Sequence, residues 1–155
     1  MQRWMAVAAL LAALLGVALP AVAKPPSFAV WHARWKARSD AKVNTANVSC
    51  ALPNSSDAEL GECVAKALLA TYPPLIAQWN RQVTDIAKGQ TDACRAAIHS
   101  YRAATSKNYA ETLAFFRAHR HASLTAIATD ARAARFQALG LGTAQTASRA
   151  GRICG

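Results

Sequence analysis

Four cysteines, Cys50, Cys63, Cys94 and Cys154, set the strongest limit on how this chain of 155 residues can fold. None of them belongs to a C-x-x-C pair, so their spacing indicates neither a redox motif nor a zinc site. If the chain is exported, the four thiols should form two disulfides. One pairing joins Cys50 to Cys63 and Cys94 to Cys154, and the other joins Cys50 to Cys154 and Cys63 to Cys94. We favour the first, because the loop that holds Cys50 can fold back on the helix that follows it.

The N-terminal segment, residues 1–23, has the pattern of a secretory signal peptide. Arg3 supplies a positive charge, an apolar stretch covers residues 5–19, and Ala21-Val22-Ala23 is a cleavage site of the A-x-A type. At 1.5 Å per residue the apolar stretch reaches only about 22 Å, which is short of a bilayer core of about 30 Å. We therefore expect cleavage after Ala23, a secreted or periplasmic location, and no transmembrane segment in the mature chain.

The mature chain, residues 24–155, is rich in alanine, poor in β-branched residues and free of period-2 alternation, which is typical of an all-helical domain. Helix starts are indicated by Ser27, by Thr91 and by the capping box of Ser56 and Glu59. Because the loops between such helices are short, the sequence predicts an all-α fold. We expect a small antiparallel helical bundle of four to five helices, stapled by two disulfides.

Several features should interrupt these helices. Tyr72-Pro73-Pro74 should break or sharply kink the helix that starts at the capping box. Residues 105–108 are either a break or a soft spot, and a long helix then continues to about Leu139, closed by Gly140 and Gly142. Whether that last helix is continuous stays open. Residues 143–155 are small, polar and basic, and we expect a flexible basic tail that Cys154 pins to the body.

The charge of the chain is strongly positive and uneven. Lys and Arg outnumber Asp and Glu by 18 to 8, a formal net charge of +10. Residues 93–155 hold nine basic residues against Glu111 and Asp130 alone, a net charge of +7. Such a segment should attract anionic partners. The leading hypothesis is therefore a non-catalytic binding module for an anionic envelope component, ligand or protein partner.

Two classes of function are not expected. Nucleic acid is not the expected partner, because the basic residues are spread over several helices and no helix or sheet for base recognition is evident. The sequence also lacks the common hydrolase, metalloprotease, phosphate-loop and calcium-loop motifs, and its acidic residues are scattered. We therefore expect no enzyme, no catalytic residues and no cofactor.

The candidate binding residues gather in the long helix: Phe115, Arg117, His119, Arg120 and His121. At 100° per residue, Arg120 falls within the apolar stripe, where a guanidinium needs an anionic partner or must turn outward. Phe115 falls on the opposite side of that helix, where the tail or another helix should cover it. The alternative is an exposed aromatic that, with Arg117 and His119 nearby, contacts an anionic planar ligand or a partner protein. His119 and His121 point about 200° apart on a helix, so they cannot share one metal ion.

An aromatic row lies in the first helix of the mature chain. Phe28, Trp31 and Trp35 repeat at helical spacing and fall on one face. We expect this row to form part of the hydrophobic core, and a stacking platform for a ligand is the alternative.

Two alternative functions remain. The order Cys50, Ser56, Glu59 and Cys63 is similar to a fragment of the small periplasmic lysozyme-inhibitor-like proteins, in which a loop Cys precedes a Ser/Thr-x-x-Glu cap and a second Cys. The similarity implies a protein inhibitor, but it covers only the segment from Cys50 to Cys63, and the family's later Trp-to-Cys stretch is not reproduced. No functional residue is carried over.

The other alternative is a haem or metal carrier. Its ligands would be His119, His121 or Tyr109.

Overall fold

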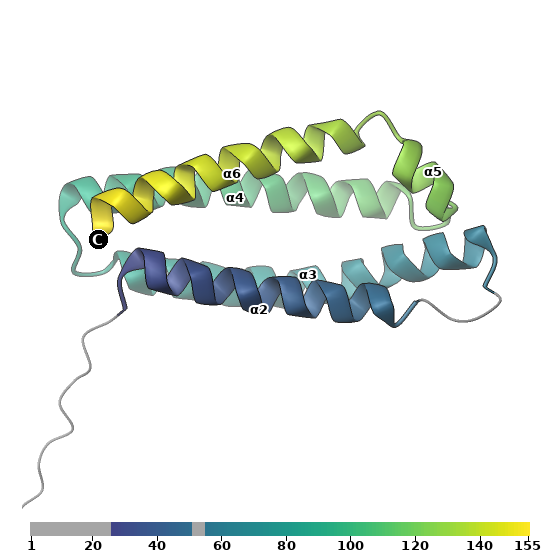
Figure 1. Ribbon diagram of the computed structural model, residues 1–155, viewed down its shortest axis with the longest axis horizontal. Coiled ribbons are helices and arrows are strands. Elements are labelled where there is room, and N and C mark those ends of the chain that lie inside the picture. The colour runs from purple at the N-terminus through teal and green to yellow at the C-terminus, as the bar shows by residue number, and fades with distance from the viewer. Residues whose placement is uncertain (1–25, 51–54) are drawn as a thin grey trace, which may run out of the picture.

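The computed structural model describes residues 26–50 and 55–155, and it shows an all-α bundle, as predicted. The predicted signal peptide, residues 1–23, lies outside these residues. The helices are α2 (Phe28–Val48), α3 (Asp57–Ala87), α4 (Asp92–Ala118), α5 (Leu124–Thr129) and α6 (Ala133–Cys154). The four long helices run alternately up and down, with α4 and α6 in one layer and α2 and α3 in the other (Figure 1). The short α5 lies across one end of the bundle and contacts α3.

The helix starts are confirmed, because the side chains that the sequence marks as caps bind the first backbone N–H groups. Ser27 accepts from the N–H of Val30, and Thr91 accepts from that of Cys94. Ser56 accepts from the N–H of Glu59, whose carboxylate in turn accepts from the Ser56 N–H at 2.8 Å. Hydrogen bonds from the Ser56 backbone and side chain lower the pKa of the Glu59 carboxyl.

The predicted break at Pro73 and Pro74 is wrong, because α3 continues through both prolines to Ala87. Each proline removes one backbone hydrogen bond and costs about 3 kcal/mol in a helix interior. Both rings lie on the exposed face, however, while Leu68, Leu75 and Trp79 are buried on the inner face before and after them. Burial of each such side chain contributes about 1.5–3 kcal/mol, which offsets the cost of the prolines.

The prediction for the last third of the chain also needs correction. The helix that starts at Thr91 passes through residues 105–108 without a break, and it ends at Ala118 rather than near Leu139. Gly140 and Gly142 do not close it, because both lie inside α6. Residues 143–154 were expected as a flexible tail but form the second half of α6. They are held there by the buried residues Ala147 and Ala150 and by the disulfide at Cys154.

The favoured disulfide pairing is confirmed. Cys50 bonds to Cys63 across a separation of 13 residues, and Cys94 bonds to Cys154 across 60. Loop-closure entropy assigns about 3 kcal/mol to the first bond and about 4 kcal/mol to the second. Bonds of this kind form in an oxidising environment such as the cell exterior. None of the helices in the described residues is long and apolar enough to cross a membrane.

Aromatic side chains fill the centre of the bundle. Phe28, Trp31 and Trp35 are all buried, so the predicted core role of this row is confirmed. The ring of Phe28 lies edge-on to that of Tyr101 with 5.3 Å between their centroids. The indole N–H of Trp79, which is fully buried, donates to the Tyr101 hydroxyl at 3.3 Å. These contacts tie α2, α3 and α4 together around Tyr101.

One glycine lets two segments approach very closely. A Cβ atom built on Gly61 of α3 would lie 2.5 Å from the backbone of Ser123 and Leu124, at the start of α5. It would also meet the carbonyl oxygen of Ala122. Only a residue without a side chain allows α5 to rest on α3 in this way.

We predict that Gly61→Ala lowers the free energy of unfolding by about 1–3 kcal/mol, because the backbone of the α4–α5 connection must move away. The matched control is Gly142→Ala. Gly142 is also helical but has open space around its Cα atom, so alanine should raise stability by up to about 1 kcal/mol. Urea unfolding of both variants measures the difference. Equal effects at the two positions would contradict the close approach at Gly61.

Candidate functional site

The structure separates the five residues that the sequence singles out. Phe115 is buried, and its ring lies 4.8 Å from that of Phe136, so α6 covers it as the sequence allowed. Arg120 is exposed, because α4 ends at Ala118 and the turn that follows takes Arg120 out of the apolar stripe. This is the outward orientation expected of a guanidinium without a buried anionic partner. Arg117 is exposed in the last turn of α4.

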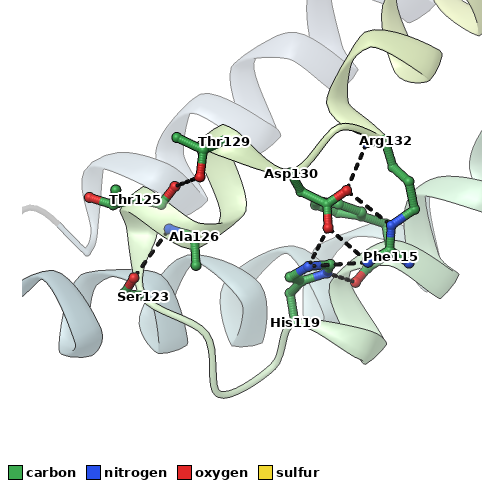
Figure 2. A network of polar contacts seen from close by, with 8 residues as sticks. All are labelled: Phe115, His119, Ser123, Thr125, Ala126, Thr129, Asp130 and Arg132. Carbon is green, nitrogen blue, oxygen red and sulfur yellow. Dashed lines mark hydrogen bonds and ion pairs between the residues drawn. The ribbon is translucent and has the colours of Figure 1, made fainter.

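Phe115 and His119 do come together, but in a polar network that joins the ends of three helices (Figure 2). The Nδ1 atom of His119 donates to the Phe115 carbonyl at 2.9 Å, and its Nε2 atom lies 3.0 Å from the Asp130 carboxylate. Asp130 accepts from the backbone N–H of Arg132 at 2.7 Å and from its guanidinium at 2.8 Å. That guanidinium also lies 5.5 Å from the centre of the Phe115 ring.

We call this network the clamp. It is not a free site for an anion, because the Arg132 guanidinium is already bound to the Asp130 carboxylate. Hydrogen bonds from the side chain and then the backbone of Arg132 hold the pKa of Asp130 well below its usual range. His119 adds a further hydrogen bond. The clamp fixes the turns that carry the chain from α4 through α5 into α6.

We predict that Asp130→Asn changes how stability depends on pH. A carboxyl group whose pKa is lower in the folded than in the unfolded state stabilises the fold. This stabilisation is full above the pKa of the unfolded state, about 4, and it is lost as the pH falls below that value. The wild type should therefore exceed Asp130→Asn in unfolding free energy at neutral pH, and the difference should shrink below about pH 4. Urea unfolding at several pH values measures it.

The control for that variant is Asp85→Asn, which removes an exposed ion pair with Lys88. Exposed pairs of this kind contribute little, so its effect should be small at every pH. A difference between wild type and Asp130→Asn that stays constant with pH would contradict the clamp.

The remaining predicted residues lie on the surface beside the start of α3. The Nδ1 atom of His121 lies 3.2 Å from the Glu62 carboxylate, and both side chains are more than half exposed. Arg120 and His121 border an open depression shared with Glu59, Glu62 and Lys66. The acidic groups there balance the basic ones, so this depression has no particular preference for anions.

The three residues of the haem or metal hypothesis, His119, His121 and Tyr109, do not lie together in one site. His119 and His121 contact carboxylates from different elements. Tyr109 lies well before His119 in α4, about 15 Å along the helix axis. Among the residues that the structure describes, no group of three His, Cys, Asp or Glu side chains could hold a metal ion.

A second feature that could hold a ligand is a cleft at the seam between α2 and α6, about 560 Å³ in volume. All four long helices line it. Its walls include His32, Trp35, Tyr72, Tyr101, Thr105, Tyr109 and Thr143. The cleft exists because α6 lines this space with Gly140, Thr143 and Ala144, and such small residues leave it unfilled.

Two threonines line this cleft, Thr105 from α4 and Thr143 from α6. Thr105 comes after Cys94 in α4, and Thr143 comes before Cys154 in α6. The number of residues between threonine and cysteine is the same in both helices. That interval makes roughly three helical turns, and α4 and α6 are antiparallel, so both threonines lie at one level and on the face of the bonded cysteines. Both hydroxyl oxygens are inaccessible to solvent and have no hydrogen-bond partner in the described part of the chain. The Tyr101 hydroxyl lies beside Thr105, but the two do not form a hydrogen bond of ordinary geometry.

The walls of the cleft are aromatic and uncharged. Burial is the main cause that raises the pKa of Tyr72, Tyr101 and Tyr109, that of Tyr109 to about 12, so all three keep their O–H at neutral pH. Burial, and then the Lys36 ammonium, lower the pKa of His32, so its ring is neutral as well.

The charged groups of the cleft lie at its rim. Lys36 and Asp40 form an exposed ion pair there, with 2.5 Å between Nζ and Oδ2. The two charges cancel, so the cleft as a whole is neutral.

We predict that Thr105→Val stabilises the protein without ligand by about 1 kcal/mol, because it removes a buried hydroxyl that has no partner among the described residues. The control is Thr84→Val. The Thr84 hydroxyl is exposed and donates to the Asn80 carbonyl at 2.8 Å, so its loss should change stability by less than about 0.5 kcal/mol. Urea unfolding gives both values, and a clear destabilisation by Thr105→Val would show that the hydroxyl has a partner.

Comparison with protein-family models, curated proteins and solved structures found no match for the chain. The fragment similar to lysozyme-inhibitor-like proteins forms a helix cap and the Cys50–Cys63 disulfide, but residues 51–54 of its loop lie outside the described residues. The function must therefore be argued from the site itself.

The sequence contained a signal for the cleft that was missed. Once Cys94 is paired with Cys154, Thr105 and Thr143 are equally far from the disulfide on antiparallel helices. The small residues of α6 at the same level then indicate unfilled space beside them.

Proposed function

We propose that this protein is an exported, non-catalytic binding protein that holds a small molecule in the cleft between α2 and α6. The observation that carries the proposal is the pair of buried hydroxyls in the wall of an aromatic cleft, those of Thr105 and Thr143, which have no partner in the described residues. Ligand sites in proteins combine apolar and aromatic walls with a few polar groups, and helical bundles build them between facing helices. A volume of about 560 Å³ is within the usual range for such sites.

The leader pattern supports export, and the two disulfides fit an oxidising compartment. The secreted or periplasmic location is part of the proposal. A binding role rather than catalysis is favoured because the described walls of the cleft contain one carboxylate, Asp40, which forms an ion pair with Lys36 at the rim.

A thermal-shift screen of the exported protein, purified with both disulfides formed, tests the proposal. A ligand at 100 times its Kd should stabilise the native state by about 2.7 kcal/mol. The compounds should cover uncharged, anionic and cationic ring compounds and aliphatic ones.

The matched variants are Ala144→Trp, which places an indole in the cleft, and Ala96→Trp, which changes an exposed α4 residue outside it. A ligand of the cleft should lose its effect in Ala144→Trp and keep it in Ala96→Trp. No shift with any compound, or a shift that survives Ala144→Trp, would contradict the proposal.

A second candidate function follows from the charge of α4 and α6, and it is association with an anionic envelope component. Six basic residues on or next to these helices make no ion pair with an acidic residue in the described part of the chain: Arg102, Lys107, Arg117, Arg120, Arg149 and Arg152. Binding to vesicles containing anionic lipid should then weaken strongly as salt shortens the Debye length to a few ångströms. Binding that salt leaves unchanged would rule out this electrostatic mode.

A further inference from the structure

The ligand of the cleft can be narrowed by the charges around it. Lys36 and Asp40 are the charged residues among the described walls of the cleft, and they neutralise each other at the exposed rim. A carboxylate or ammonium group placed beside Thr105 and Thr143 would therefore lose its hydration without gaining a counter-charge, which is costly. The part of the ligand that reaches the two threonines must be uncharged.

The two hydroxyls also define what that uncharged part must do. A threonine hydroxyl donates one hydrogen bond and accepts up to two. Thr105 and Thr143 line the cleft from the neighbouring helices α4 and α6, and their hydroxyl oxygens lie beneath its wall without any partner in the described residues. A threonine in a helix populates two χ1 rotamers, so rotation of the side chain can turn each hydroxyl toward a ligand. A ligand hydroxyl between them can accept from one and donate to the other, whereas a purely apolar group would leave both unsatisfied.

The walls define the rest of the ligand. Aromatic rings reach the cleft from three helices: Trp35 from α2, Tyr72 from α3, and Tyr101 and Tyr109 from α4. Trp79 supports Tyr109 edge-on with 5.6 Å between the ring centroids. Such an arrangement accepts a further flat ring in edge-to-face or offset contact, and these contacts add to the effect of apolar burial.

We infer that the cleft binds an uncharged aromatic compound that carries a hydroxyl group, a phenol, with the hydroxyl between Thr105 and Thr143 and the ring among the tyrosines. This inference rests on the proposed function of the cleft and names its ligand class. The volume exceeds that of one phenol ring, so substituents fit toward the rim beside Asn44 and Asn108.

Four compounds with the same methyl-substituted six-membered ring test the inference in titration calorimetry of the exported protein. They are p-cresol, toluene, which lacks the hydroxyl, 4-methylbenzoate, which is charged, and 4-methylcyclohexanol, which is not aromatic. We expect p-cresol to bind at least about tenfold more tightly than each of the others. A site that hydrogen-bonds a ligand hydroxyl discriminates strongly against an analogue that lacks it.

Variants then assign the preference to the two threonines. In Thr105→Val/Thr143→Val the affinity for p-cresol should fall about tenfold and its advantage over toluene should disappear. Thr105→Ser/Thr143→Ser keeps both hydroxyls and should keep the advantage, which separates hydrogen bonding from a change in packing. Thr84→Val, on the exposed side of α3, should behave like the wild type.

The outcomes separate the two proposals. If toluene or 4-methylbenzoate binds as well as p-cresol, or if the advantage of p-cresol survives in the valine variant, the phenol inference is wrong. If p-cresol fails but another compound stabilises the protein in a manner that Ala144→Trp abolishes, the cleft is a ligand site of another class. If no compound binds, both proposals are wrong.

Discussion

The bond between Cys94 and Cys154 is the constraint on which the rest of this bundle depends. Helix α6 has little apolar surface to offer, because the buried residues among its described side chains are Ala147 and Ala150. An alanine side chain contributes much less apolar burial than a leucine or tryptophan. The disulfide supplies the missing attachment at the C-terminal end of α6, and at the other end of the helix the clamp of Asp130 and Arg132 fixes the turn that leads into it.

A helix held at both ends can leave space along its middle, and the cleft lies there. The aromatic residues of α2, α3 and α4 form a close-packed frame around Tyr101, while α6 closes the fourth side with glycine, threonine and alanine. Two hydroxyls in the wall of this space, Thr105 and Thr143, have no hydrogen-bond partner in the described residues, although buried polar groups are usually hydrogen-bonded. Proteins tolerate such local violations most often at functional sites, where stability is given up for binding.

Local features of the fold could be predicted from the sequence. The caps at Ser27, Ser56 and Thr91 and the aromatic row that begins at Phe28 depend on residues only a few positions apart, and the structure confirms them. The path of α3 across Pro73 and Pro74 could not be predicted, because burial of distant side chains outweighs the local effect of proline there.

The candidate site could not be predicted from the sequence, because it too depends on contacts between distant residues. Helical phase placed Arg120 in an apolar stripe, but the helix ends at Ala118, so the phase carries no meaning past that point. Phe115 lies before that point, and it is buried because α6 packs against it. Thr105 and Thr143 lie at one level only because of how α4 and α6 are aligned along their axes. This alignment can be worked out once Cys94 is known to bond to Cys154. The spacing of the cysteines alone leaves two pairings open.

The most direct measurement is an NMR titration of the protein, with both disulfides formed and its threonine methyl groups labelled, because each methyl group reports on its own surroundings. The account predicts that p-cresol shifts the signals of Thr105 and Thr143 together and saturably, with nuclear Overhauser contacts from the ligand ring to both methyl groups. The signal of Thr84, on the exposed side of α3, should stay in place. Signals of Thr105 and Thr143 that do not move at saturating p-cresol, or contacts from the ligand to other parts of the bundle, would contradict the cleft as the site of binding.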